Sequence, residues 1–335
     1  MFNSRINKYA NKQLKRCEKF TKKVGFLFRL IEYMLIFLYN KCVWAILKEN
    51  IMAVNISNYT KKKNFLICVD SDGCAIDSMD VKHFNCFGPC MVEEWNLHKW
   101  KEEILARWNQ INLYTLTRGI NRFKGLAMAL LEINDKYCEI EDINTLYEWS
   151  NKTKELSNEA LIKAINDNPN SISLKKALSW SNAVNKSITE LSIDRKPPYQ
   201  YVKEALTLAH QKADVAIVSS ANLAAVMEEW EHYKLIEHTD IVLAQNAGTK
   251  AICIAKLLEK GYLKENVLMC GDALGDLKAA QSNGVLFYPI IARHEATSWK
   301  EFIDVVLEKF LNGTYANEYQ AQKERQFIDN LSDNK

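Results

Sequence analysis

The sequence has 335 residues, which exceeds the usual size of one domain and leaves room for a core with a second module. About half of the residues are apolar and a quarter are charged, as in globular proteins. The nine cysteines follow no regular spacing, and their number is odd. This usage argues against a disulfide scaffold and predicts free thiols in a reducing compartment, hence a cytoplasmic protein.

The first 63 residues differ in charge from the rest of the chain. They contain 14 Lys or Arg against 3 Asp or Glu, whereas the remainder contains 30 against 38. An apolar stretch covers residues 24–47, but Arg29, Glu32 and Lys41 interrupt it, and a spanning helix needs about 20 mostly uncharged residues. Because no small-residue cleavage site follows, we do not expect a cleaved signal peptide.

Three interpretations of this extension stay open. Residues 1–50 would make a peripheral contact with an anionic membrane as a basic amphipathic helix, or they would form a poor signal anchor. Alternatively, the segment is an appendage upstream of a natural start at Met52. We favour the last and expect a chain that starts at Met52 to be soluble and as active as the full chain.

The rest of the chain begins with a strand followed by a long helical stretch. Residues 64–70 (NFLICVD) form an apolar run that ends in an acid, which is typical of a buried parallel strand. Residues 80–200 show helical spacing of apolar side chains and no strand pattern, with helices expected over 158–167 and 172–191. Two prolines, Pro197 and Pro198, close this block.

Strands and helices then alternate. We expect strands at 214–219, 240–244, 266–271 and 285–290, and helices over 199–211, 222–231, 249–260, 275–282 and 298–311. Such alternation predicts an α/β fold, a Rossmann-like doubly wound parallel sheet with an all-helical insertion after the first strand. The expected parts are an extension (1–63), a core (64–80 and 197–312), a helical cap (81–196) and a frayed polar tail (313–335).

A pair of carboxylates follows the first strand. Asp70 and Asp72 are two residues apart, so in extended backbone their side chains point the same way, and Gly73 allows a sharp turn after them. One carboxylate would attack a phosphorus atom, while the other would protonate the leaving oxygen and then activate water. The carboxyl ends of the strands are where doubly wound sheets bind ligands.

Two further segments carry groups that suit a phosphate. Ser219, Ser220 and Asn222 lie between a strand and a helix, where a hydroxyl and free amides would cradle a phosphoryl group. Lys250 starts a helix, and its ammonium would neutralise charge between the nucleophile and the phosphoryl oxygens.

A fourth segment supplies ligands for a metal ion. Asp272 and Asp276 follow another strand, and beside Asp70 they would make an oxygen-rich pocket suited to Mg²⁺. The cation would offset the repulsion between these acids and the phosphate.

These four segments, in this order, resemble the four motifs of the haloacid dehalogenase (HAD) superfamily, over residues 64 to about 295. The opening DSDGCAIDS is similar to the family's DxDGTxxDS, with Cys74 where Thr is usual and Ala75 where Leu is usual. The helical insertion between the first and second motifs resembles the family's C1-type cap. An acid at position 72 favours phosphatases and mutases over dehalogenases and ATPases.

The resemblance also implies roles for single residues. Asp70 would be the nucleophile and Asp72 the general acid and base. Ser219 matches the hydroxyl of the second motif and Lys250 the lysine of the third. The magnesium ligands would be the side chains of Asp70, Asp272 and Asp276 and the backbone carbonyl of Asp72.

One segment of the insertion points to substrate binding. Residues 117–125 (TRGINRFKG) resemble the cap substrate loop of β-phosphoglucomutase-like members. Arg118, Arg122 and Lys124 would bind a second anionic group or a sugar phosphate, unless they are surface charges at a helix start.

Two other patterns in the insertion have less specific readings. His83, Cys86 and Cys90 have a zinc-like spacing, but three ligands without a second cluster favour a hinge between core and cap, with His83 near the substrate. The tryptophans are expected in the core of the insertion rather than on a base-stacking surface; they are residues 95, 100, 108, 149 and 180. No nucleic-acid partner is predicted.

The function predicted from these residues is a Mg²⁺-dependent phosphohydrolase that acts on a small phosphorylated metabolite through an aspartyl-phosphate on Asp70. The first alternative is a phosphomutase that uses the same intermediate. A C–P hydrolase would need a Schiff-base lysine, for which Lys82, Lys99 or Lys101 would serve, but the acid at position 72 argues against it. The last alternative is a non-catalytic, membrane-tethered binding protein. The sequence does not predict the oligomeric state.

Overall fold

The computed structural model describes residues 56–332. The basic start of the chain, the membrane contact expected for residues 1–50 and the start expected at Met52 lie outside the described residues. Within the described part, no helix has both the length and the apolar character needed to cross a bilayer.

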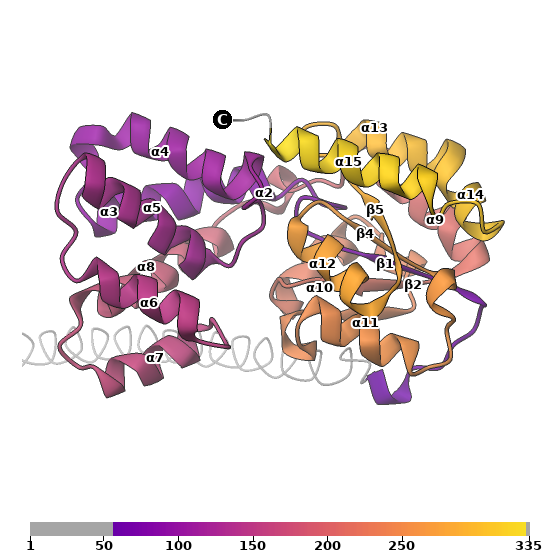
Figure 1. Cartoon of the computed structure of the whole chain (residues 1–335), viewed down its shortest axis with the longest axis horizontal. Helices are drawn as coiled ribbons and strands as arrows, with labels where there is room; N and C mark the ends of the chain where they lie inside the picture. Colours follow the sequence, from indigo (N-terminus) through magenta and orange to yellow (C-terminus); the bar gives the residue numbers. More distant parts are fainter. Residues whose placement is uncertain (1–55, 333–335) are drawn as a thin grey trace, which may run out of the picture. The chain divides into compact units, whose positions relative to one another are not determined.

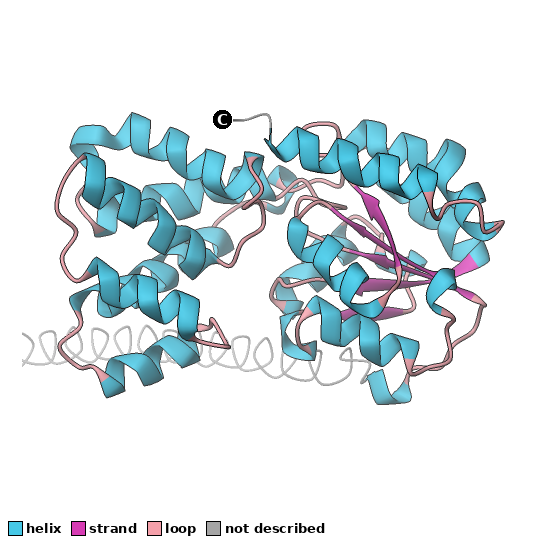
Figure 2. Cartoon of the chain, in the orientation of Figure 1, coloured by secondary structure: helices cyan, strands magenta, loops and turns pink. Residues whose placement is uncertain are grey.

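Five parallel strands form one sheet in the order β3-β2-β1-β4-β5. Figure 2 shows the strands in magenta with helices around them. The strands are β1 (Phe65–Val69), β2 (Ala213–Val218), β3 (Ile241–Leu243), β4 (Val267–Gly271) and β5 (Leu286–Pro289). β1 is central, and the chain moves outward from it first through β2 and β3 and then through β4 and β5. The predicted α/β fold is confirmed, and each strand lies within two residues of its expected bounds.

Alternate side chains of the strands build two hydrophobic cores, one on each face of the sheet. Ile67 and Val69 belong to one core, and Leu66 and Cys68 belong to the other. The first face is covered by α9 (Val202–Lys212), α10 (Leu223–His232), α13 (Glu295–Glu301) and α14 (Leu307–Leu311). The second is covered by α11 (Lys250–Leu258), α12 (Leu274–Asn283) and α15 (Glu318–Ser332) (Figure 1).

The insertion after β1 is helical throughout and has a core of its own. Its α-helices are α2 (Met79–Lys82), α3 (Gly88–Glu94), α4 (Lys101–Asn109), α5 (Arg122–Lys136), α6 (Ile143–Lys152), α7 (Asn158–Asp167) and α8 (Ile172–Thr189). Two π-helical turns, η2 (His83–Phe87) and η4 (Gln110–Tyr114), follow α2 and α4. All five tryptophans of the insertion pack in or against this separate core, as expected.

The end of the chain corrects a prediction. We expected a frayed polar tail from residue 313, but α15 is a fifteen-residue helix that packs on the sheet. Phe327 and Leu331 are buried in the second core, and Lys323 forms an ion pair with Glu301. Apolar side chains four residues apart give the helix one narrow buried stripe, which its high polar content obscures.

The segment before β1 also belongs to the core. Tyr59 is buried, its hydroxyl lies 2.7 Å from that of Tyr262, and the backbone amides of Lys62 and Lys63 donate to Asp214. Residues 56–63, which the sequence grouped with the extension, therefore pack against the sheet. We propose the remaining division into a core and a helical cap at residues 81–196 on the basis of their separate hydrophobic clusters.

Candidate active site

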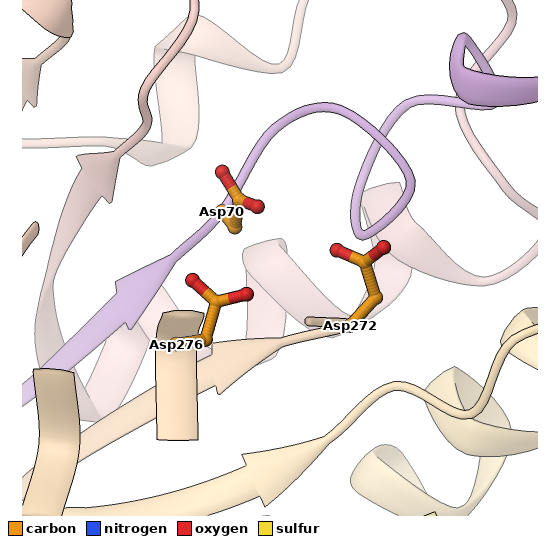
Figure 3. Close-up of side chains that lie close together, drawn as sticks. All are labelled: Asp70, Asp272 and Asp276. Carbon is orange, nitrogen blue, oxygen red and sulfur yellow. The ribbon is translucent and has the colours of Figure 1, made fainter. Parts of the chain in front are cut away.

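Three buried carboxylates meet at the carboxyl ends of the two central strands. Asp70 follows β1, Asp272 follows β4, and Asp276 lies in the first turn of α12 (Figure 3). One oxygen from each carboxylate lies within 4.8 Å of one from each of the others. The chain leaves β1 for β2 on one side and later returns to β4 on the other side, so the edge between β1 and β4 is a switch point, where sheets of this kind bind ligands.

Two glycines permit this close arrangement. A side chain on Gly73 would meet Asp272 Oδ2 at 2.5 Å, and the φ of Gly73 is +77°, which disfavours other residues. A side chain on Gly271 would meet the Asp276 carboxyl carbon at 2.3 Å. The loop after β1 can therefore approach Asp272 only because Gly73 lacks a Cβ, and Asp276 can lie over the end of β4 only because Gly271 does.

Lys250 is the cation of the cluster. Its Nζ lies 2.7 Å from Asp70 Oδ2 and 2.5 Å from Asp276 Oδ1. Burial acts against the ammonium, but the two carboxylates raise its pKa above the usual value. The first residue of α11 thus joins the nucleophile candidate to a metal-ligand candidate, and its charge-neutralising role toward a phosphoryl group stays a prediction.

The acids also raise one another's pKa. Burial, followed by the charge of Asp272 and opposed by Lys250, raises the pKa of Asp70 above its usual value. Burial raises the pKa of Asp272 and of Asp276 to about 6. Three buried acids against few cations make a site in which an added cation is stabilising.

The residues fit a hard divalent cation. Asp272 Oδ1 is buried and has no hydrogen-bond partner among the described residues, although a buried carboxylate oxygen normally has one. All three converging side chains offer carboxylate oxygen, the donor that Mg²⁺ prefers. The fourth predicted ligand, the backbone carbonyl of Asp72, stays a prediction.

The side chain of Asp72 lies apart from this cluster, within a second polar group. Its Oδ1 accepts hydrogen bonds from Ser78 Oγ at 2.5 Å and from Lys82 Nζ at 2.7 Å. Burial acts against ionisation, but Lys82 lowers the pKa of Asp72 below the usual range. The side chain is partly exposed, so it can reach a leaving group or a water molecule.

The predicted phosphate loop follows β2. Ser219 is buried at the end of that strand, and its Oγ accepts from the amide of Ala221. Ser220 is exposed beside it. Asn222 is the N-cap of α10, where its Oδ1 accepts from the amides of Ala224 and Ala225. Its side-chain oxygen is thus engaged in capping, and the predicted substrate contact of Asn222 stays a prediction.

Arg118 connects the insertion to the acid cluster. Its Nε lies 2.7 Å from Asp272 Oδ2, and its Nη1 donates to the carbonyl of Leu113. The side chain is almost fully buried, so the alternative of a surface charge is wrong for this residue. Arg118 balances the charge of Asp272 in this structure, whereas its predicted contact with a substrate anion stays a prediction.

Arg122 and Lys124 behave differently from Arg118. Arg122 donates to Ser181 and Asn185 and lies over the ring of Phe87. Burial lowers its pKa to about 10, and it has no acidic partner among residues 56–332. Lys124 is half-buried at the start of α5 and forms neither a hydrogen bond nor an ion pair within the described part of the chain.

His83 is buried against Phe87 and Trp108 of the insertion. Its Nδ1 accepts a hydrogen bond from Trp108 Nε1, and its ring stacks on Phe87. Burial, followed by the charge of Arg118, lowers its pKa to about 3, so the ring is neutral. The described residues include no metal-ligand cluster with His83, Cys86 and Cys90, which removes support from the zinc interpretation.

Sequence reasoning missed the group around Asp72. Ser78 lies inside the quoted first motif, so its proximity to Asp72 had a local signal. Lys82 entered only as a Schiff-base candidate, and Lys196 and Glu229 carried no signal at all. Lys196 and Glu229 join this group only through the tertiary fold, and they are connected to Asp72 through Lys82.

The sequence model of the family described as haloacid dehalogenase-like hydrolase matches residues 129–290. This range contains Ser219, Lys250, Asp272 and Asp276, which the fold brings to the same end of the sheet as Asp70. The match covers just under half of the chain and shows that this segment is similar to the haloacid dehalogenase-like hydrolases. It supports an enzyme of the hydrolase class, and the helical insertion is consistent with the cap of this family.

Several solved structures are similar to this chain. One is a haloacid dehalogenase-like hydrolase from Streptococcus pneumoniae (10% identity, 73% of this chain and 97% of that chain, TM-score 0.40). Another is a haloacid dehalogenase-like family hydrolase from Xanthomonas campestris (12% identity, 80% of this chain and 98% of that chain, TM-score 0.42). A third is a predicted phosphoglycolate phosphatase from Haemophilus somnus (13% identity, 68% of this chain and 84% of that chain, TM-score 0.38). No curated protein matches the chain.

Proposed function

We propose that this protein is a Mg²⁺-dependent phosphatase that cleaves a small phosphomonoester through an aspartyl-phosphate on Asp70. The observation that carries the proposal is the position of Asp70 at the end of β1. Its carboxylate lies 2.7 Å from Lys250 Nζ and close to two further buried acids, with Asp72 two residues along the chain. This arrangement supports a nucleophile, a charge-neutralising cation and metal ligands in one cluster, with a candidate acid in the adjoining polar group.

Each residue has a distinct role in the first step. A carboxylate oxygen of Asp70 forms a bond to phosphorus while the bond from phosphorus to the leaving oxygen breaks. Asp72 gives its proton to that oxygen, so the leaving group departs as an alcohol. Lys250 holds Asp70 and stabilises charge on the phosphoryl oxygens. A bound Mg²⁺, held by Asp70, Asp272, Asp276 and the Asp72 carbonyl, would supply further charge stabilisation.

In the second step, Asp72 takes a proton from a water molecule whose oxygen attacks the aspartyl-phosphate. Inorganic phosphate is released, and the carboxylate of Asp70 is restored. Ser219 and Ser220 border the phosphoryl position at the end of β2, and the amides at the start of α10 would donate to it.

The insertion supports a small phosphorylated metabolite as the substrate. Arg122 is a partly buried cation without an acidic partner among the described residues, a position in which a bound anion would be favourable. His83 and Lys124 lie on the same insertion.

The described cysteines are all free, which supports a reducing, cytoplasmic compartment.

Phosphate release from a panel of small phosphomonoesters tests this function. We expect release that requires Mg²⁺ and that falls by roughly 10⁴-fold or more in Asp70→Asn, because the nucleophile is lost. Asp304→Asn is the matched control, since it changes an exposed acid paired with Lys300. Isomerised sugar phosphate without stoichiometric free phosphate would instead support a mutase. Full activity of Asp70→Asn would contradict the assignment.

A further inference from the structure

Asp72 is one member of a chain of four alternating charges. Lys82 Nζ lies 2.7 Å from Asp72 Oδ1 and 3.6 Å from Glu229 Oε1. Lys196 Nζ lies 2.9 Å from the same Glu229 oxygen. Lys82, Glu229 and Lys196 are 6%, 1% and 4% exposed, so this is a buried network rather than a surface salt bridge.

The members come from both connections between the core and the helical insertion. Lys82 ends α2, where the chain leaves the core. Lys196 lies in the segment that returns to the core, between η5 (Ile193–Arg195) and α9. Glu229 belongs to α10, the helix that follows the phosphate loop. A single core carboxylate therefore receives one lysine from each connection.

The contacts on Asp72 leave one of its oxygens available. Ser78 and Lys82 both donate to Oδ1, and within the described residues no protein group donates to Oδ2. Fixing one oxygen defines the direction of the other. Oδ2 is therefore the oxygen that can face a leaving group or a water molecule.

The geometry gives Lys82 two carboxylate partners and Glu229 two lysine partners. A buried ammonium without a carboxylate is costly, so Lys82 stays where both carboxylates reach it. Glu229 thereby fixes Lys82 beside Asp72, and Lys196 in turn keeps Glu229 in place.

We propose that Glu229 is a positioning residue for the general acid, acting through Lys82 to hold Asp72 in its working orientation. The inference rests on the proposed function, because it assigns a partner to the proton donor of that reaction. Glu229 touches no reacting atom. Its loss is expected to harm proton donation rather than the attack by Asp70.

The choice of leaving group separates these two effects. Phenyl phosphate and 4-nitrophenyl phosphate have similar shapes, but nitrophenolate is a much better leaving group and needs little help from a proton. A defect in proton donation therefore lowers kcat/KM for phenyl phosphate selectively. A general loss of folded or correctly shaped enzyme lowers both values equally.

Two variants separate positioning from folding. Glu229→Gln leaves Lys196 as an uncompensated buried charge, which by itself reduces stability. The double variant Glu229→Gln/Lys196→Met removes both charges of that pair but still deprives Lys82 of its second carboxylate. The matched control Glu301→Gln/Lys323→Met removes a comparable ion pair between α13 and α15.

We expect the double variant to lose roughly tenfold or more of kcat/KM on phenyl phosphate and less than about twofold on 4-nitrophenyl phosphate. The quantity compared is the ratio of kcat/KM on phenyl phosphate to kcat/KM on 4-nitrophenyl phosphate. Asp72→Asn should lower this ratio further, and the control pair Glu301→Gln/Lys323→Met should leave it unchanged. Equal losses on both esters, or no loss, would overturn the inference while the phosphatase function stands. Wild-type protein that hydrolyses neither ester would overturn the proposed function as well.

Discussion

Burial at this site determines how single side chains carry charge. His83 is neutral because its ring is buried beside Arg118, and its Nδ1 is occupied by the hydrogen bond from Trp108. Lys82 lowers the pKa of Asp72 as well, against the effect of burial. Both shifts make the folded state lose stability as the pH falls, His83 below about 6.5 and Asp72 only below about 4, so the two effects fall in different pH ranges and can be separated by substitution.

The pH dependence of folding tests the environment of His83. Its pKa is about 3 in the folded protein and about 6.5 when exposed, so between these values the unfolded state binds the proton. The free energy of unfolding should therefore fall as the pH falls below 6.5, by about 2 kcal/mol at pH 5 from this group alone. Above pH 7 the ring is neutral in both the folded and the unfolded state, so His83 no longer changes the free energy of unfolding with pH.

Urea unfolding at pH 7 and pH 5 measures this effect. We expect the loss of stability between the two values to be smaller in His83→Gln than in the wild type by about 2 kcal/mol. The exposed His98→Gln should behave as the wild type does. An identical loss in wild type and His83→Gln would show that His83 is not buried as a neutral ring.

The sequence predicted candidate site residues where a reactive side chain stands at a strand or helix end. Asp70, Lys250, Asp272 and Asp276 were proposed in this way, and the fold brings them together, while their roles stay predictions. The pairing of Arg118 with Asp272 could not be predicted, because it joins residues 154 positions apart across two parts of the fold. The same holds for the contact of Lys196 with Glu229.

Among whole elements, those with a strong periodic pattern were predicted well. The buried strands are continuous apolar runs, and α7 and α8 begin directly after Ser157 and Ser171, whose side chains cap them. α15 was missed because its buried stripe is narrow, consisting of Phe327, Leu331 and the stem of Lys323. Its stability comes from packing on the sheet rather than from its own sequence.

A truncation of Phe327 measures what α15 contributes. Phe327 is fully buried and stacks edge-on against Phe287 of β5. Phe327→Ala should lower the free energy of unfolding by about 3–5 kcal/mol, through lost burial and the cavity left behind. Arg325→Ala on the exposed side of the same helix is the control. Similar small effects from both substitutions would mean that the helix is not anchored to the sheet.

For the molecule as a whole, the order of motifs along the chain predicted the architecture. A single strand, a long helical insertion and a series of alternating strands and helices allow few arrangements other than a parallel sheet with an inserted helical unit. The position of the active site follows from that topology, since all strands point their carboxyl ends the same way. The contacts between the insertion and the core do not follow from it.

The central claim is that Asp70 carries the phosphoryl group during turnover. The most direct test is to quench the enzyme during turnover of 4-nitrophenyl phosphate with Mg²⁺, reduce it with borohydride, and sequence its peptides by mass spectrometry. Reduction converts an aspartyl-phosphate to homoserine. We predict homoserine at position 70 in the wild type, and none without Mg²⁺ or in Asp70→Asn. Homoserine at another position, or sustained turnover by Asp70→Asn, would contradict the account.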